Sequence, residues 1–311
     1  MTVTYNSEDV LADFLTSVSE LDPVKTKLFA IDNASKDTTV DVLSTYSESR
    51  PAEIIRNSGN RGVAFGNNQG IVAALKEGFD WILLINNDTC FNAEAFHSLV
   101  REAERVGASI ISPFIEAEEP PHSVWYTDAH LYLWRGAKVK HVGMGRPLSA
   151  VPRETKVVSY ASTCVLLVHS SVFKNVGLMD PQFFVYGDDV DFAIRARRAG
   201  LSLWSTGSAV FFHKASSLTG EYTGPFSTRW ITRNWVLACR IHCSRVQQFS
   251  ALCYMTVWTL ARLLVRADPI SATTNRVRAF LEGLQLAVFQ PPSLESWPHD
   301  EGRWAEQWDG V

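Results

Sequence analysis

The nine residues WILLINNDT, at positions 81–89, are the clearest sign of architecture in this sequence. Trp81 to Ile85 form an unbroken apolar run, and three polar residues, Asn86, Asn87 and Asp88, follow at once. An apolar strand that ends abruptly in polar residues is typical of an open parallel sheet, whose ligands bind at the carboxyl ends of the strands. The stretch therefore predicts an α/β protein.

Short apolar runs alternate with amphipathic stretches around this strand, as expected for βαβ units. We expect strands at 3–5, 28–31, 53–55 and 109–111, and helices after residue 8, at 62–78 and at 92–106. The helix at 62–78 carries a small residue at every fourth position, namely Gly62, Gly66, Gly70, Ala74 and Gly78. Glycine is costly inside a helix, so something must approach this face closely, and tight packing on the sheet is the favoured explanation.

Composition excludes several classes of protein. The 311 residues are 46% apolar and 20% charged, as in ordinary globular proteins, and the net charge of −4 argues against nucleic-acid binding. The five cysteines form no CxxC pair, so we expect neither a disulfide framework nor a tetrahedral zinc site. The first ten residues lack a basic start and an apolar core, and residues 246–261 are too short and polar to span a bilayer. We expect a cytoplasmic protein, with peripheral attachment at the inner face of the cell membrane left open.

Acidic residues follow two predicted strands and open one predicted helix. Asp32 and Asp88 come directly after strands, where a carboxylate can bind a base, a ribose or a divalent metal, although a single such Asp more often forms a turn. Asp188, Asp189 and Asp191 open the helix at 188–199. They are either first-turn acids, with an ion pair from Asp191 to the residue four positions on, or a site with a general base.

Several motifs in this order resemble those of the family 2 inverting glycosyltransferases, and most closely the rhamnosyltransferase-like branch. They are VTYNS (3–7), AIDNASKD (30–37), NSGNRGVAFGNNQG (57–70), LLINNDT (83–89), FFVYGDDVDFAIRARRAG (183–200) and FFHKASS (211–217). The resemblance runs from residue 2 to about residue 240. It implies a GT-A fold, in which a Rossmann-like nucleotide-binding sheet merges with an acceptor-binding half. We expect a GT-A domain at 1–225, with the nucleotide-sugar half at 1–112 and the acceptor and catalytic half at 113–225.

The same resemblance assigns roles to individual residues. It implies that the nucleotide-sugar donor is bound by Thr4, Tyr5, Asn6, Asp32, Asn33, Asn60, Gly62, Asn67, Asn68, Asn87 and Asp88. Asp88 and His213 would hold a divalent metal, Mg²⁺ or Mn²⁺, although Asn86 replaces the first acid of the usual D-x-D motif. Asp189 would be the catalytic base, assisted by Asp188 and Asp191. The pair Arg233–Asn234 resembles an RN pair of related enzymes.

The C-terminal third differs in chemistry from the rest. Residues 226–290 hold eight arginines, no lysine and two acids, and they predict two or three helices with apolar faces. Two interpretations remain open, namely a helical layer packed on the core with its arginines in solvent, and a surface for an anionic membrane. Residues 291–311 form an acidic tail with Trp297, Trp304 and Trp308. The tail could fold back on the basic surface or pair with a partner chain, so a homo-oligomer is also open.

The leading functional hypothesis is an inverting glycosyltransferase of bacterial surface polysaccharide or glycolipid synthesis. It would move a sugar, with L-rhamnose from dTDP-rhamnose as the first choice, to a glycan or lipid-linked acceptor. A UDP-sugar donor, such as UDP-galactofuranose, is an alternative. A catalytically inactive homologue, which serves as a scaffold in a glycan-assembly complex, is an alternative of another class.

Overall fold

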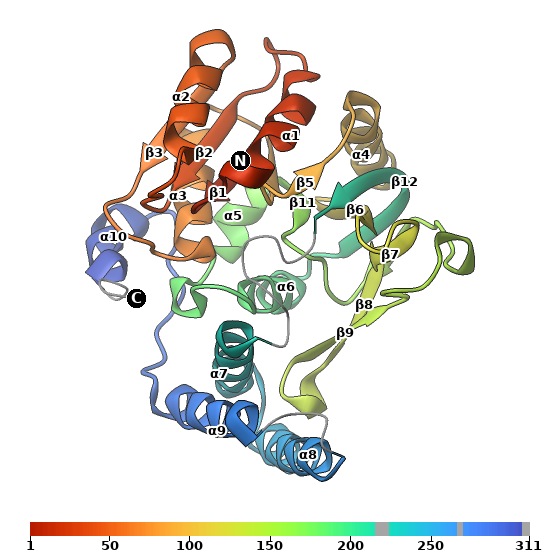
Figure 1. Ribbon diagram of the computed structural model, residues 1–311, viewed down its shortest axis with the longest axis vertical. Coiled ribbons are helices and arrows are strands. Elements are labelled where there is room, and N and C mark those ends of the chain that lie inside the picture. The colour runs from red at the N-terminus through yellow and green to blue at the C-terminus, as the bar shows by residue number, and fades with distance from the viewer. Residues whose placement is uncertain (215–223, 266–269, 307–311) are drawn as a thin grey trace.

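The structure is a computed structural model that describes residues 1–214, 224–265 and 270–306 (Figure 1). Its N-terminal part is a parallel sheet of β1 (Thr2–Thr4), β2 (Leu28–Asp32) and β3 (Ala52–Arg56), in the order β1-β2-β3. Helices α1 (Glu8–Ser19), α2 (Thr39–Ser49) and α3 (Val63–Lys76) alternate with these strands. The βαβ units that the sequence predicts here are confirmed.

The second sheet is mixed, with strand order β10-β12-β6-β11-β4. Its strands are β4 (Trp81–Ile85), β6 (Ile110–Ala117), β10 (Lys156–Val158), β11 (Val165–His169) and β12 (Leu203–His213), with β5 (Thr89–Cys90) on β12 and β7 (Ser123–Tyr126) on β6. Met1 joins the two sheets, since its amino group donates a hydrogen bond to the Leu83 carbonyl at 2.7 Å and its carbonyl accepts the Ile85 N–H at 3.1 Å. The carboxyl ends of β1, β2 and β4 therefore meet at one edge.

The remaining elements cover and extend these sheets. Helices α4 (Ala93–Val106), α5 (Ser170–Val176) and α6 (Asp188–Arg198) pack on the second sheet or on one another, and β8 (Asp128–Tyr132) pairs with β9 (Lys138–Val142) as a hairpin. Short 3₁₀ turns are η1 (Leu133–Arg135), η2 (Leu148–Ala150) and η3 (Pro181–Phe183). The sequence predicted irregular strands in this middle region, but not the continuation of β6 through Pro113. A register shift in β12 between Thr206 and Val210 lies opposite that proline.

The small residues of α3 have the packing role that the sequence favours. A Cβ at Gly66 would lie 2.8 Å from the Val3 side chain, and one at Gly70 would lie 2.7 Å from Ile31. Because both neighbours belong to the parallel sheet, the helix can approach that sheet only where it has no side chain. Gly62 is different, since it faces the backbone of another loop and belongs to the site described below.

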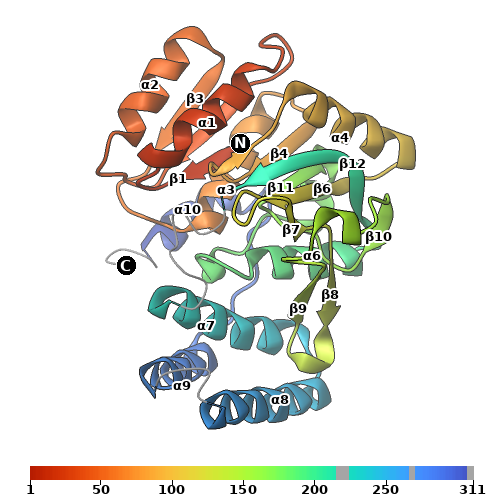
Figure 2. The same cartoon turned by 45° about the vertical axis from the view of Figure 1, so that its right-hand side comes forward.

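Three helices follow in the C-terminal region, α7 (Pro225–His242), α8 (Arg245–Leu264) and α9 (Ile270–Gln285). Figure 2 shows α7 beneath α6, with α8 and α9 forming the far end of the molecule. The expectation that the arginines face solvent is wrong for Arg233, which is 1% exposed. Within the described residues, no helix combines the length and the hydropathy that a membrane crossing requires.

Helix α10 (Trp297–Glu306) folds back on the core instead of on the arginine-rich helices. Trp297 and Trp304 are both 2% exposed, and the Trp297 ring lies 5.2 Å from the ring of Phe65 in α3. Figure 1 shows α10 beside α3, far along the chain from it. Trp308 lies outside the described residues, as do residues 215–217 of the FFHKASS motif.

Candidate active site

Asp32 stands at the carboxyl end of β2 and is almost fully buried. Its carboxylate accepts hydrogen bonds from the Thr4 hydroxyl at 3.1 Å, from the Ser35 N–H at 3.0 Å and from the Ser35 hydroxyl. The bond to the Ser35 N–H is the turn-forming bond expected of a strand-end Asp. Thr4 and Asp32, which the sequence places 28 residues apart, are therefore brought together at one strand edge.

Asn33 links this edge to the loop before α3. Its amide donates to the Gly62 carbonyl at 3.1 Å and its oxygen accepts from the Asn57 amide at 2.8 Å. Asn60 accepts the Gly62 N–H at 3.0 Å, so Asn33, Asn60 and Gly62 form one connected loop. Helix α10 braces the same loop from outside, because Glu301 accepts from Gln69 at 2.9 Å and Gln69 bonds Asn57 through both of its amide atoms.

The other residues expected to bind the donor have different environments. Tyr5 is exposed, and Asn6 accepts the Lys36 N–H at 2.8 Å, so both lie on the rim of the Asp32 turn. Asn67 is buried in α3. Asn68 is fully buried. Its side-chain oxygen accepts the Met179 N–H at 2.8 Å, and its side-chain nitrogen donates to the Met179 carbonyl at 2.9 Å. Asn68 thus holds α3 to the segment before η3.

Asp88 and His213 meet across the second sheet, 3.1 Å apart between Oδ1 and Nε2, and both are buried. Burial lowers the pKa of His213, but Cys164 and Asp88 outweigh it and raise that pKa to about 10. The site therefore favours a positive charge beside Asp88. Asn87, next in the chain, donates to the Ser7 hydroxyl at 2.8 Å, which holds this strand end against β1 and α1.

The residues present fit a divalent ion that is shared with a diphosphate. Within the described ranges no group of three or more His, Cys, Asp and Glu side chains gathers at one point. Mg²⁺ needs no such cage, because it is commonly bound by one or two carboxylates together with substrate phosphates and water. One carboxylate and one imidazole at a buried point that favours positive charge are compatible with this mode of binding, in which the ion would take the place of a His213 proton.

Asp188 and Asp189 open helix α6 directly after a strained loop. Phe184 and Tyr186 both have positive φ, 52° and 63°, which is unusual for bulky residues. Asp189 is half-buried and accepts the Tyr160 hydroxyl and the Val190 N–H, the latter at 2.8 Å. Burial raises the pKa of Asp189 in spite of these donors.

Asp188 is buried beside Asp189. Burial, followed by the charge of Asp189, raises the pKa of Asp188 to about 8. Its Oδ2 atom is buried with no hydrogen-bond partner among the described residues. Asp188 is therefore largely neutral at pH 7 and adds little negative charge beside Asp189.

Asp191 has a supporting position on the same helix. Its carboxylate is hydrogen-bonded to Arg195 Nε and to His242 Nε2, each at 2.8 Å, and Asp191 is 1% exposed. Burial raises the pKa of Asp191, but Arg195 and His242 outweigh burial and lower this pKa below its ordinary value. The ion pair four residues along the helix, one of the two interpretations of this acid cluster, is therefore present, and it ties α6 to α7.

The pair Arg233–Asn234 in α7 is far more important to the site than the sequence indicates. The Asn234 amide donates to the carbonyls of Phe183, Val185 and Tyr186, at 2.6, 2.8 and 2.7 Å. Arg233 donates to the Gln182 carbonyl at 2.9 Å. One helix thus fixes the backbone of the whole loop that leads to Asp188 and Asp189, and only the family resemblance could point to it.

Gly62 joins the loop before α3, which contains Asn60, to this acid-bearing loop. Its φ is 83°, and a Cβ there would lie 2.4 Å from the Phe184 carbonyl oxygen. The next N–H, that of Val63, donates to the same oxygen at 2.6 Å. Only glycine permits this contact, because a side chain would meet both an unfavourable φ and a backbone atom.

We expect Gly62→Ala to disable the site. With φ 83° and ψ 171°, Gly62 occupies a backbone region that is essentially restricted to glycine and costs alanine about 1–3 kcal/mol, and the Phe184 backbone must also move away. Transfer should therefore fall much further than stability does, as measured by initial rates and by thermal unfolding. Gly78→Ala is the matched control, since its φ is also +83° but a Cβ would meet nothing within 4 Å. If both variants behave alike, the contact with Phe184 is irrelevant to activity.

The segment 160–164 connects the two charged centres. Tyr160 donates to Asp189, while the Cys164 carbonyl accepts the Asn86 N–H at 2.9 Å, two residues before Asp88. Four residues of fully extended chain span at most about 14 Å, so the Cα atoms of Tyr160 and Cys164 cannot be further apart. A short segment of chain therefore links the loop that bears Asp189 to the end of the strand before Asp88.

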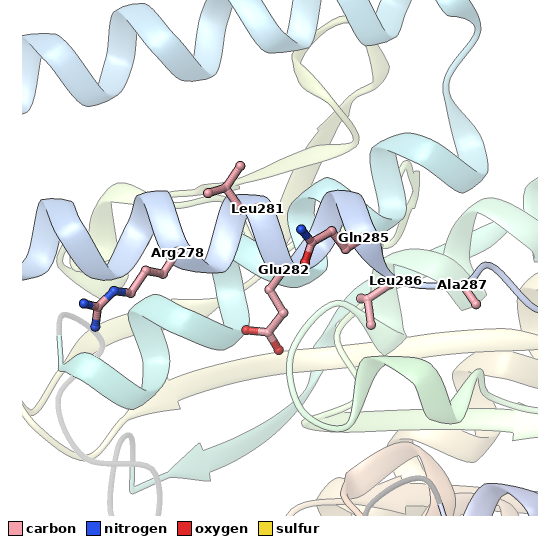
Figure 3. Close-up of a pocket in the computed structure, with 6 residues that line it drawn as sticks. All are labelled: Arg278, Leu281, Glu282, Gln285, Leu286 and Ala287. Atoms are coloured by element: carbon pink, nitrogen blue, oxygen red, sulfur yellow. The ribbon is translucent and has the colours of Figure 1, made fainter.

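An open hollow of about 560 Å³ lies elsewhere, along α9 (Figure 3). It is lined by Arg278, Leu281, Glu282, Gln285, Leu286 and Ala287. None of the residues expected to bind donor or metal, or to act in catalysis, belongs to it. Figure 3 shows Glu282 and Leu281 leaving α9 on opposite sides, and Glu282 is bound to Arg229 and Arg233 of α7. The hollow is a surface feature of the helical region and not the catalytic cleft.

Comparison with known proteins now fixes the family. Residues 1–177 match the family described as "Glycosyl transferase family 2", which is more than half of the chain. The chain belongs to glycosyl transferase family 2. It is accordingly a glycosyltransferase, and the matched region contains Asp32, Gly62, Asp88 and Tyr160 of the site described above.

Two relatives extend the similarity beyond the matched region. The low-salt glycan biosynthesis hexosyltransferase Agl10 of Haloferax volcanii is 24% identical over 298 residues, covering 94% of this chain and 92% of that protein. The N-acetylglucosaminyl-diphospho-decaprenol L-rhamnosyltransferase of Mycobacterium tuberculosis is 28% identical over 235 residues, covering 69% of this chain and 75% of that protein. Family 2 enzymes that transfer hexoses are therefore the class to which this chain is similar.

The fold is shared with a solved structure, that of GalNAc-T7 with UDP, GalNAc and Mn²⁺. The TM-score is 0.62 at 13% identity, and the match covers 100% of this chain and 57% of that one. The expected GT-A fold, followed by a helical C-terminal region, is confirmed.

Proposed function

We propose that this glycosyltransferase works with inversion and moves L-rhamnose from dTDP-rhamnose to a glycan or lipid-linked acceptor. The observation that carries the proposal is Asp189, a carboxyl group at the start of α6 that accepts the Tyr160 hydroxyl and is linked through Tyr160 and Cys164 to the Asp88–His213 centre. The choice of rhamnose and of a lipid-linked acceptor is supported by the resemblance to rhamnosyltransferases and by the mycobacterial relative.

The chemistry is an in-line displacement at the anomeric carbon. The acceptor hydroxyl oxygen forms the new bond to that carbon, and the bond to the diphosphate oxygen breaks with its electron pair. Asp189 takes the hydroxyl proton as the new bond forms. The Tyr160 hydroxyl orients the carboxylate for this step and stabilises its charged form, while the neutral Asp188 adds no second charge beside it.

We place the nucleotide-sugar donor along the edge where β1, β2 and β4 end. Thr4, Asp32 and Asn33 hold the base and ribose, supported by the loop at Asn60 and Gly62. Asp88 and His213 would be the residues that hold a divalent ion, Mg²⁺ or Mn²⁺, near the diphosphate. Such an ion would neutralise the negative charge that develops on the leaving diphosphate. The similar structure with UDP, GalNAc and Mn²⁺ supports this placement.

A thermal-shift titration with dTDP, UDP and GDP, each with and without Mg²⁺ or Mn²⁺, tests this arrangement. A nucleotide at one hundred times its Kd stabilises the folded state by about 2.7 kcal/mol, which is readily seen. We expect dTDP to give the largest shift and Asp88→Asn to remove its metal dependence. The control is Asp41→Asn, a change of the same chemistry on the exposed side of α2, which should respond as the wild type does.

Each other outcome of that titration has a definite meaning. A larger shift with UDP would replace dTDP-rhamnose by a UDP-sugar such as UDP-galactofuranose. If Asp88→Asn keeps the full metal dependence, Asp88 does not hold the ion. No shift with any nucleotide would contradict the proposal and favour the scaffold alternative.

A further inference from the structure

Helix α8 is apolar on both of its sides. One side packs inward through Ala251 and Met255, which are buried. The other side is exposed along the whole helix, and its apolar residues are Val246, Phe249, Leu252, Val257, Leu260, Leu263 and Leu264. Phe249 is 69% and Leu264 82% exposed, although surface helices normally present polar residues to water. An apolar face of this length indicates that something else covers it.

Neighbouring elements extend this exposed face of α8. Trp134 in η1 is 59% exposed, and its carbonyl accepts the Ser250 hydroxyl of α8 at 3.0 Å. On α9, Val277, Leu281 and Leu284 are about half exposed. Figures 1 and 2 both place α8 and α9 together at the end of the molecule opposite α1 and α2. We call these residues of α8, α9 and Trp134 the distal face.

The charges at this end of the molecule are almost all positive. Among the described residues of α7, α8 and α9, every charged side chain except Glu282 is an arginine, and Arg245 and Arg278 are exposed, whereas Arg233 and Arg276 are buried. Glu282 is bound to Arg229 and Arg233 at 3.1 and 3.3 Å. A hollow of about 390 Å³, lined by Arg240, Arg245, Gln248 and Val288, lies at the start of α8. Cationic side chains therefore border an apolar surface.

We infer that the distal face docks this enzyme onto an anionic phospholipid surface. Leu, Val and Phe side chains would enter the boundary between head groups and acyl chains, Trp134 would lie at head-group level, and the arginines would contact lipid phosphates. A second copy of the chain would not use the surrounding positive charge, because two such faces repel each other. Contacts run from α6 to α7 and from α7 to α8 and α9, so the acid cluster stands about two helix layers, at 8–10 Å each, above the bilayer.

This inference deepens the lipid-linked acceptor of the proposed function, and it is tested without turnover. The probe is co-sedimentation with vesicles of phosphatidylcholine, with and without phosphatidylglycerol, at low and high salt. We expect binding only to the anionic vesicles and release by salt. Phe249→Ser with Leu260→Ser should weaken binding at least tenfold. Arg278→Gln should weaken it about fivefold and reduce its salt dependence.

A matched control comes from the other end of the molecule. Val24→Ser alters a residue that is 89% exposed in the connection between α1 and β2, and it should bind vesicles as the wild type does. Thermal unfolding confirms that each variant is folded, and light scattering reports the oligomeric state. Equal binding by the Phe249/Leu260 variant and the wild type would overturn the inference, as would absence of binding by the wild type. A wild-type dimer that this variant dissociates would assign the face to a second copy instead.

Discussion

Asp189→Asn should lower the rate of sugar transfer by about 10²–10⁴-fold, the usual contribution of a general base. The amide is nearly the same size as the carboxylate and can still accept from Tyr160, but it cannot take the acceptor proton. The donor-binding residues at Thr4, Asp32 and Asn33 are untouched, so the thermal shift with nucleotide should persist. Retained turnover in this variant would remove Asp189 from the role of base.

The pH dependence gives an independent check on the same residue. Because Asp189 must be ionised to act, kcat/KM should fall as the pH drops through its raised pKa. Tyr160→Phe removes a donor to the carboxylate, so it should move this acidic limb to still higher pH. A purely structural tyrosine would change the rate at every pH and leave the limb where it is.

Asn234→Ala should be the most damaging change outside the reacting groups. It removes the donor that three backbone carbonyls share, and each unsatisfied buried group costs about 1–3 kcal/mol. Water can reach some of these carbonyls, so we expect a loss of about 3 kcal/mol in unfolding free energy and a larger fractional loss of transfer. Phe184 and Tyr186 have strained φ values, and without the amide they can relax and carry Asp188 and Asp189 out of place.

The control for Asn234 is Asn275 on the adjacent helix α9. Within the described residues its amide makes one long bond, 3.5 Å to the Pro225 carbonyl, at a half-buried position. Asn275→Ala should therefore change stability by no more than about 0.5 kcal/mol. Chemical denaturation measures both variants. An Asn234→Ala protein as stable and active as the control would show that the loop needs no clamp.

The sequence predicts the strands that end at the candidate site, and the helix that packs on them, because their signals are local. Residues 28–31 and 81–85 are continuous apolar runs that end in polar residues, and the four-residue spacing of small residues marks the helix that packs on them. Both features survive in the structure as β2, β4 and α3. The positions of Asp32 and Asp88 at strand ends follow from the same local pattern.

The remaining features depend on contacts that are distant in the chain. Nothing near Asn234 shows that its amide holds a loop 48 to 51 residues away, and nothing near Arg233 shows that this arginine is buried. The fold-back of α10 depends on Trp297 meeting Phe65, a contact that composition leaves undecided between this core and the arginine-rich helices. Likewise, the motif at 57–70 led us to expect that Asn68 binds the nucleotide sugar, yet its amide is hydrogen-bonded to the Met179 backbone.

The most direct measurement is the anomeric configuration of the product, determined by NMR after transfer from dTDP-rhamnose to a lipid-linked acceptor. Displacement with Asp189 as base predicts a rhamnoside whose configuration is opposite to that of the donor, formed by the wild type and lost in Asp189→Asn. A product with the donor's configuration, or equal transfer by both proteins, would contradict the mechanism proposed for this site.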